Sequence, residues 1–288
     1  MSWFFLSILA AFSLATSDAL TKRFFSHLSA YEMGLIRLTY TLPWLLGAIF
    51  FIPWSRPDKV FFICLSVGLP LEALAFYCYM KALKVSPLSL SLPFLAFTPI
   101  FIILTGWLLL GETTSYAGFF GIVLIVMGSY FLNLSRITRG YLEPFKAIFK
   151  ERGSRLILLV SFIYSITSTL GKLAILHSNP YFFGVIYFTT FTLLMVSFLP
   201  VVPGAKPGNL IKMPLPGLIL GATVALMIFS HMLAISMVQA AYMISIKRTS
   251  LIFGVLYGAW WFKEEKIKER LTGAFIMIVG VFLIGCFG

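Results

Sequence analysis

The chain has 288 residues, of which 60% are apolar and only 11% are charged, and its mean hydropathy is +0.98. This composition excludes an ordinary soluble domain, and the basic residues behind the formal charge of +12 stand between apolar runs, which excludes a nucleic-acid partner. We therefore expect an all-α polytopic membrane protein in a lipid bilayer, because backbone polar groups in hydrocarbon must be satisfied within helices or a closed barrel.

Ten apolar runs are continuous and about twenty residues long, which suits helices that cross the hydrocarbon core. In chain order we predict transmembrane helices over residues 3–21, 31–52, 60–80, 88–110, 115–133, 156–175, 181–200, 216–238, 241–262 and 270–286. The connections are short except for one basic stretch. This organisation predicts a first five-helix repeat over 1–134, a basic interfacial linker over 135–155 and a second five-helix repeat over 156–288.

The second half of the sequence repeats the first at an offset of 150 to 152 residues. The recurring pairs include Thr16 and Thr167, Tyr31 and Tyr181, Gly34 and Gly184, Glu112 and Glu264, Gly121 and Gly273, and Gly128 and Gly280. Because five is an odd number of spans, the second copy enters the membrane from the opposite side, and we expect inverted repeats. In secondary transporters of this architecture the substrate site lies near the midplane, where the repeats meet.

Each predicted half ends its fourth helix in a similar turn, followed by a glycine-spaced fifth helix. The turn reads Leu110-Gly111-Glu112 in the first half and Lys263-Glu264-Glu265 in the second. This duplicated pattern resembles the EamA-type family of the drug/metabolite transporter superfamily, over almost the entire chain. The resemblance implies a basket-like bundle with a central cavity lined by helices one to four and six to nine, and helices five and ten as scaffold.

Charges inside the predicted helices are costly unless they face a cavity, a partner or a helix end. Glu72, in the third helix, is a candidate for proton coupling, with a structural ion pair as the alternative. Arg37, Lys247 and Arg248 are candidates to bind an anionic group of a substrate. Adjacent helical residues point about 100° apart, so we expect one of Lys247 and Arg248 to face the cavity and the other to snorkel or to cap a helix.

Uncharged polar side chains supply further candidates. His231 is a candidate for substrate binding or a proton relay, although a lone histidine is more often a packing residue. Tyr40, Tyr77 and Tyr187 are candidates for an aromatic cavity wall, and packing or the interfacial belt is the alternative for each.

Prolines and interfacial charges complete the set of predictions. Pro93 and Pro99 interrupt the fourth helix, which makes it a candidate gate. Local spacing favours an ion pair of Asp18 with Lys22, and Lys172, close to a helix end, is expected to snorkel.

The function that these features predict is secondary transport of a small polar or amphipathic metabolite, such as an amino acid, by alternating access. Multidrug export and a non-transport scaffold subunit are the alternatives. No paired carboxylates, nucleophile elbow, phosphate loop or metal motif occurs in the sequence, so we expect neither an enzyme nor a cofactor. We expect a monomer or homodimer in a prokaryotic inner membrane. Both termini should be extracytoplasmic, because Lys and Arg gather on the side that carries the linker.

Overall fold

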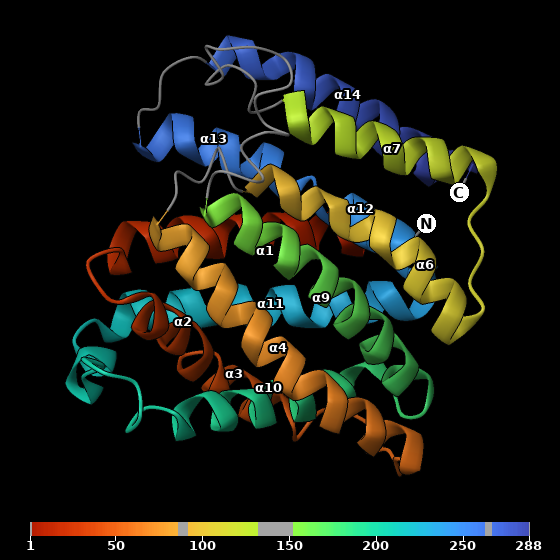
Figure 1. Cartoon of the computed structure of the whole chain (residues 1–288). Coiled ribbons are helices and arrows are strands. Elements are labelled where there is room, and N and C mark those ends of the chain that lie inside the picture. Colours follow the sequence, from red (N-terminus) through yellow and green to blue (C-terminus); the bar gives the residue numbers. More distant parts are fainter. Residues whose placement is uncertain (1, 86–91, 132–151, 263–266, 288) are drawn as a thin grey trace.

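The computed structural model describes residues 2–85, 92–131, 152–262 and 267–287, and all regular structure in these ranges is helical. The predicted linker over 135–155 and the turn at 263–266 therefore lie largely outside the described residues. Figure 1 shows the helices as a bundle in which the N- and C-termini lie at the same end.

The first half begins with three described helical segments that correspond to the first two predicted spans: α1 (Ser2–Phe25), α2 (Ala30–Thr39) and α3 (Leu42–Ala48). It continues with α4 (Lys59–Val85), the short 3₁₀ helix η1 (Leu92–Phe97), α6 (Thr98–Leu110) and α7 (Tyr116–Phe131).

The second half follows the same order. It comprises α9 (Arg152–Leu176), α10 (Pro180–Ser197), the short 3₁₀ helix η3 (Pro207–Ile211), α11 (Pro214–Met237), α12 (Ala240–Lys247), α13 (Ser250–Phe262) and α14 (Ile267–Phe287).

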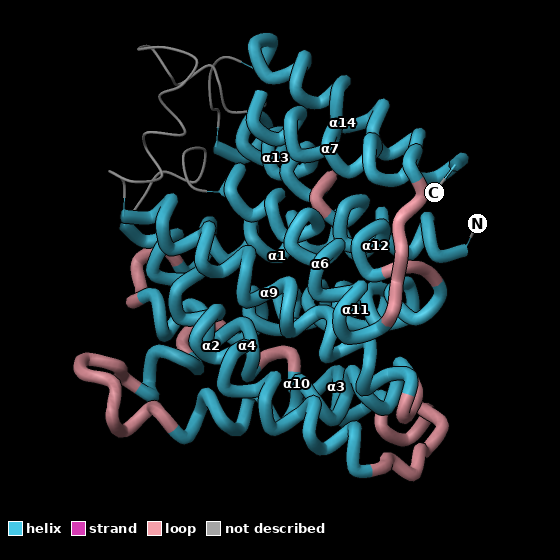
Figure 2. The backbone as a smooth tube through the Cα atoms, turned by 45° about the vertical axis from the view of Figure 1, so that its right-hand side comes forward, coloured by secondary structure: helices cyan, strands magenta, loops and turns pink. Residues whose placement is uncertain are grey.

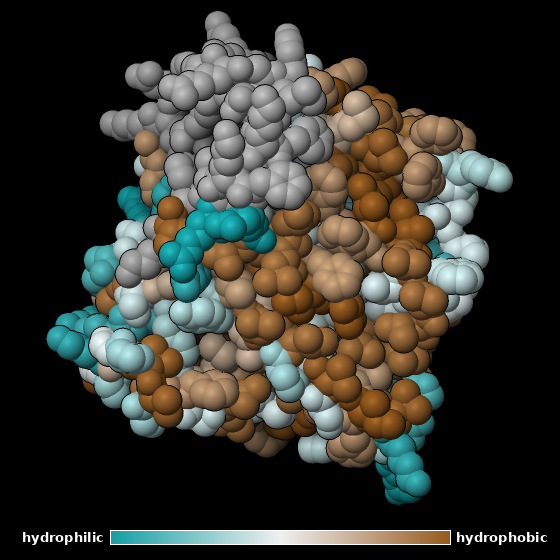
Figure 3. All heavy atoms as spheres, in the orientation of Figure 1, coloured by the Kyte–Doolittle hydropathy of each residue, from teal (hydrophilic) through white to brown (hydrophobic). Residues whose placement is uncertain are grey.

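By length and composition, five described helices can each cross a membrane: α1, α4, α9, α10 and α11. Large apolar side chains are exposed on many helices, among them Phe5, Trp107, Phe120 and Trp260. Figure 3 shows apolar residues over the middle of one face, with hydrophilic residues gathered toward its two ends. This arrangement is typical of a bundle whose flank contacts lipid.

Local capping explains where several helices begin. Ser29 and Glu32 form a reciprocal capping box at the start of α2, and the Asn179 side chain accepts a hydrogen bond from the Phe182 N–H at the start of α10. These side chains satisfy N–H groups that the first helical turn leaves without partners.

Asp58 precedes α4 and connects the two halves at one end of the bundle. Its carboxylate accepts hydrogen bonds from the backbone N–H groups of Phe61 and Val60, and it lies 2.7 Å from Nδ1 of His177, after α9. The Phe61 N–H in particular, together with His177 and the Val60 N–H, lowers the pKa of Asp58 below its ordinary value, and desolvation offsets part of that effect.

Three spans that the sequence predicts as single helices are interrupted. The second breaks at Tyr40–Thr41, because Pro43, in the first turn of α3, has no N–H to continue the helix. The fourth changes from 3₁₀ to α geometry between Phe97 and Thr98, one residue before Pro99.

The ninth predicted span breaks at Arg248–Thr249, where neither proline nor glycine is present. The Thr249 N–H bonds to the Ile246 carbonyl at 3.0 Å, and the Leu251 N–H bonds to the Arg248 carbonyl at 3.0 Å. These three-residue bonds tighten the chain between α12 and α13. The breaks after Phe97 and after Arg248 occupy corresponding positions of the two repeats.

Helices of the two halves pack in reciprocal pairs. The most extensive contacts join α7 with α14, α4 with α9, and α1 with α11, followed by α6 with α9 and α1 with α13. Exchanging each helix for its repeat counterpart converts the α4–α9 contact into α11–α1, and α6–α9 into α13–α1. Figure 2 shows α1, α9 and α11 in the middle of the bundle, with α7 and α14 together at one edge.

The recurring glycines lie where α7 and α14 pack against each other. A Cβ atom built on Gly121 would lie 2.9 Å from the Gly280 carbonyl oxygen, and one built on Gly128 would lie 2.7 Å from the Gly273 carbonyl oxygen. The two backbones therefore approach too closely for any larger residue. This packing is the physical reason for the glycine spacing in the fifth and tenth predicted helices.

Candidate functional site

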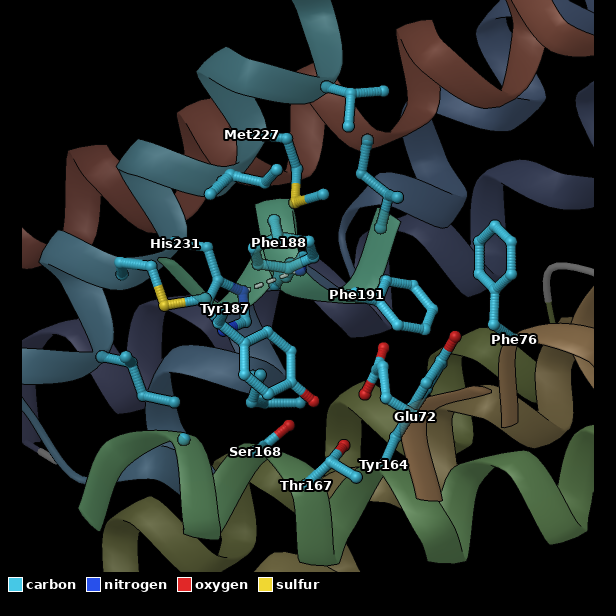
Figure 4. Close-up of a pocket in the computed structure, with 18 of the residues that line it drawn as sticks. Glu72, Phe76, Tyr164, Thr167, Ser168, Tyr187, Phe188, Phe191, Met227 and His231 are labelled. Atoms are coloured by element: carbon cyan, nitrogen blue, oxygen red, sulfur yellow. Dashed lines mark hydrogen bonds between the residues drawn. The ribbon is translucent and has the colours of Figure 1, made fainter. Parts of the chain in front are cut away.

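A central cavity of about 170 Å³ lies between the two halves. Its described walls come from α1, α2, α4, η1, α9, α10, α11 and the end of α12. Aliphatic and aromatic side chains form most of the wall, and a smaller set of polar groups points inward (Figure 4). An apolar cavity with a few oriented polar groups suits a small organic solute.

Most of the sequence-predicted site residues line this cavity: Arg37, Glu72, Tyr187, His231, Lys247 and Arg248. They come from α2, α4, α10, α11 and the junction of α12 with α13. The structure thus brings polar groups of both halves to one place.

Arg37 already has a carboxylate partner. Its Nη1 donates to Oδ1 of Asp18 at 2.5 Å, and its Nη2 donates to the Ser17 hydroxyl at 2.8 Å, both on α1. Tyr79 of α4 donates its hydroxyl to Oδ2 of the same Asp18 at 3.5 Å. Asp18, which local spacing pairs with Lys22, therefore links α1, α2 and α4 beside the cavity.

Lys247 and Arg248 both line the cavity, contrary to the expectation that only one of them faces it. Lys247 ends α12 and Arg248 is its C-cap, so the chain leaves the regular helix at this point. Nζ of Lys247 forms a hydrogen bond of 2.7 Å with Nδ1 of His231 on α11. Nη2 of Arg248 donates to the Thr98 hydroxyl at 2.8 Å, so a hydrogen bond joins the break at Arg248–Thr249 to the break at Phe97–Thr98.

Glu72, on α4, also lines the cavity. Figure 4 shows its carboxyl group pointing into the same space as the hydroxyl groups of Tyr187 and Ser168, with Thr167 next to it. Within the described residues Glu72 forms no ion pair, although Lys247 is near enough to interact electrostatically. The cavity wall therefore contains one acidic side chain together with several basic ones.

Several predicted residues are not in the described cavity wall. The ring of Tyr40 packs against Gly217 of α11, and the Tyr40 carbonyl lies against Gly221. Tyr77 is 45% exposed, with Nζ of Lys81 5.5 Å from its ring centroid. Both face away because their helix positions turn them toward a neighbouring helix or the outer surface.

The two gating candidates belong to the interrupted fourth span. Pro99 is buried in the first turn of α6. A proline is tolerated there because the N–H groups of a first helical turn have no acceptor within the helix. Pro93 lies in η1, and its side chain is outside the described residues.

The turn that carries the repeated glutamate forms a polar network beside the cavity that the sequence did not predict. Gly111 adopts the left-handed conformation with φ of 66°, and this turn brings Glu112 back toward α6. Lys172, expected to snorkel, instead lines the cavity and donates to Oε1 of Glu112 and to the Val238 carbonyl. Oε2 of Glu112 accepts from the Ala240 N–H at 2.8 Å, at the start of α12.

The sequence profile of the EamA-like transporter family matches residues 1–134 and 152–286, nearly the whole chain in two parts. The chain belongs to the EamA-like transporter family. A member of this family is an integral membrane protein of the drug/metabolite transporter type, so the predicted family is confirmed and the predicted class of function agrees with it.

The fold of this EamA-like chain is also that of a solved structure, described as the crystal structure of a protein. The two are 14% identical and superpose with a TM-score of 0.73, over 98% of this chain and 94% of the other. A search of curated proteins found no significant match.

Proposed function

We propose that this EamA-like protein is a secondary transporter that moves a small polar or amphipathic metabolite, such as an amino acid, by alternating access. The observation that carries the proposal is the central cavity, which both halves line and into which Glu72, Lys247 and Arg248 project. Charged groups inside a membrane bundle are costly to retain unless they serve a pathway, a partner or a ligand.

The proposal includes ten spans in two inverted halves. An odd number of helices in each half gives the halves opposite orientations, and the reciprocal contacts α1–α11 and α4–α9 are those expected of a two-fold axis in the membrane plane. Under such symmetry the two halves exchange roles when the cavity changes the side to which it opens.

Interrupted helices in corresponding positions support a hinge at this site. In secondary transporters, discontinuous helices of the two halves meet at the substrate site. Here η1 and α6 separate at Phe97–Thr98, α12 and α13 separate at Arg248–Thr249, and the Arg248–Thr98 hydrogen bond joins the two breaks. We propose that Pro93 and Pro99 favour bending at the first of them.

Flux into proteoliposomes tests the proposal directly. Purified protein should exchange an internal radiolabelled metabolite for an external one from a library of amino acids, nucleosides, organic acids and cationic dyes. Exchange of polar metabolites supports the proposal, whereas exchange restricted to cationic dyes favours a multidrug exporter. If no compound exchanges through protein that remains folded in the vesicles, the scaffold alternative replaces transport.

Glu72 is our candidate for proton coupling. A carboxyl group in a partly apolar cavity that forms no ion pair with any described residue is suited to bind and release a proton. Glu72→Gln should abolish uptake driven by a pH gradient while counterflow exchange continues. Loss of both activities in the folded variant would assign Glu72 to substrate binding or structure instead.

The proposed orientation places both termini outside the cytoplasm. Lys206 and Lys212, in the loop between α10 and α11, belong to the strongly basic side. A cysteine at exposed Gly208 in this loop should be protected from an impermeant thiol reagent in intact cells, and one at exposed Thr113 should react. Both variants need Cys286→Ser, because Cys286 is exposed. The reverse labelling pattern overturns the orientation.

A further inference from the structure

The cations around the cavity differ in whether a carboxylate neutralises them. Arg37 is paired with Asp18, and Lys172 is paired with Glu112. Within the described part of the chain, Lys247 and Arg248 form no ion pair. The structure therefore separates cations that hold helices together from cations that remain available to a ligand.

Arg248 is the most incompletely satisfied of these groups. The residue is 5% exposed, its Nη2 donates to the neutral hydroxyl of Thr98, and its buried Nε has no hydrogen-bond partner among the described residues. A guanidinium remains charged under physiological conditions and presents five N–H donors in a planar fork. A buried cation with a free donor is destabilising until an anion or another acceptor reaches it.

Lys247 adds a second positive group at the same end of α12. Its Nζ is hydrogen-bonded to a histidine nitrogen and not to an acid, and its side chain lines the cavity with that of Arg248. The carboxyl group of Glu72 lines the same cavity, but it forms no salt bridge with Lys247 or Arg248 in the described part of the chain. Two adjacent cations with no carboxylate pair form a site for an oxyanion.

We propose that the transported substrate carries an anionic oxygen group, a carboxylate or a phosphate, which Arg248 and Lys247 bind directly. Arg37 is then a positioning residue, held by Asp18, and not an anchor. This inference rests on the proposed transport function and narrows its substrate class. It replaces three equivalent candidate cations with one defined pair.

Matched ligand pairs test the substrate class on the wild-type protein. Thermal stability of the purified protein should rise with L-leucine, benzoate or inorganic phosphate, and should not rise with L-leucinamide or benzamide, which lack the oxyanion. The phosphate arm distinguishes a phosphate site from a carboxylate site. Equal stabilisation by acid and amide, or no stabilisation by any of the three ligands that carry an anionic oxygen group, overturns the inference.

Substitutions then locate the site. Arg248→Gln should weaken binding of the stabilising anion at least about 30-fold, and Arg248→Lys, which keeps the charge but loses the fork, should weaken it less. Arg56→Gln, at an exposed arginine outside the cavity, is the matched control and should leave affinity unchanged. Should Arg248→Gln fail to fold, Arg248→Lys and the acid–amide comparison still decide the question.

Failure of this inference is distinguishable from failure of the transport proposal. Exchange in proteoliposomes of amines or other solutes that lack a carboxylate or phosphate group, and of none that carry one, would retain transport and reject the anion site. Absence of exchange for every class would reject transport itself.

Discussion

The ion pair between Glu112 and Lys172 is expected to hold three parts of the bundle together. The side chains are 15% and 9% exposed, respectively, and Glu112 also accepts from the Ala240 N–H at the start of α12. Glu112→Gln removes the negative charge but keeps an oxygen for the Ala240 N–H. Lys172 then retains only the Val238 carbonyl among its described partners.

The magnitude follows from the burial of the pair. Removing one partner of a buried ion pair costs about 3 to 5 kcal/mol, because the other charge is left uncompensated. The amide that replaces Glu112 still accepts one hydrogen bond, and some solvent reaches the site, so we expect a smaller loss, about 2 to 3 kcal/mol. Reversible unfolding in mixed detergent micelles, followed by circular dichroism, measures this loss.

The double variant Glu112→Gln/Lys172→Met is the matched control. Because it removes both charges and fills the lysine volume with an apolar chain, its free energy of unfolding should lie within about 1 kcal/mol of the wild type. A loss of unfolding free energy in the double variant that equals the sum of the losses for Glu112→Gln and Lys172→Met measured singly would show that the two side chains are not coupled. A loss below about 1 kcal/mol for Glu112→Gln alone would contradict the expectation that the Glu112–Lys172 pair acts as a buried ion pair.

Two further predictions concern stability. Gly221→Ala should destabilise the protein by about 1 to 3 kcal/mol, since a Cβ atom there would lie 1.9 Å from the Tyr40 carbonyl oxygen, whereas Gly254→Ala, with nothing within 4 Å, should be neutral or slightly stabilising in the same unfolding assay. Asp58, whose pKa is lowered by backbone N–H groups and by His177, stabilises the fold above the pKa of its unfolded state. This contribution should be lost as the pH falls through the lowered folded-state pKa, so acidification should destabilise the wild type more than Asp58→Asn, and equal pH profiles would contradict the linkage.

Helix content and the main repeat were predictable from the sequence because they depend on composition and on periodic residues. Apolar runs specify helices in hydrocarbon, and the recurring glycines mark the α7–α14 contact. Two breaks carry a proline signal, at Pro43 and Pro99. The break after Arg248 carries none, and the side-chain hydrogen bond made there joins Arg248 to Thr98, far away in the sequence.

Partners of charged residues were less predictable, because a membrane bundle pairs residues that are far apart in sequence. Spacing along one helix favours Asp18 with Lys22, yet in the folded bundle Arg37 of α2 also reaches Asp18. Likewise, the sequence makes Tyr77 and Tyr187 equally good candidates for the cavity wall. Only the packing of α4 and α10 turns one toward the surface and the other into the cavity.

The repeat and its exceptions have different roles in the cavity. Arg37 and Tyr187 occupy corresponding positions of the two halves, as do Lys247 and Leu95, and all four line the cavity. The duplicated fold thus directs equivalent positions inward, whatever side chain they carry. Because a symmetric wall would have no charge difference across it, the chemistry of the site arises where the halves differ. Lys247 in place of a leucine is one such difference, and together with Arg248 it makes one part of the cavity wall attractive to an anion.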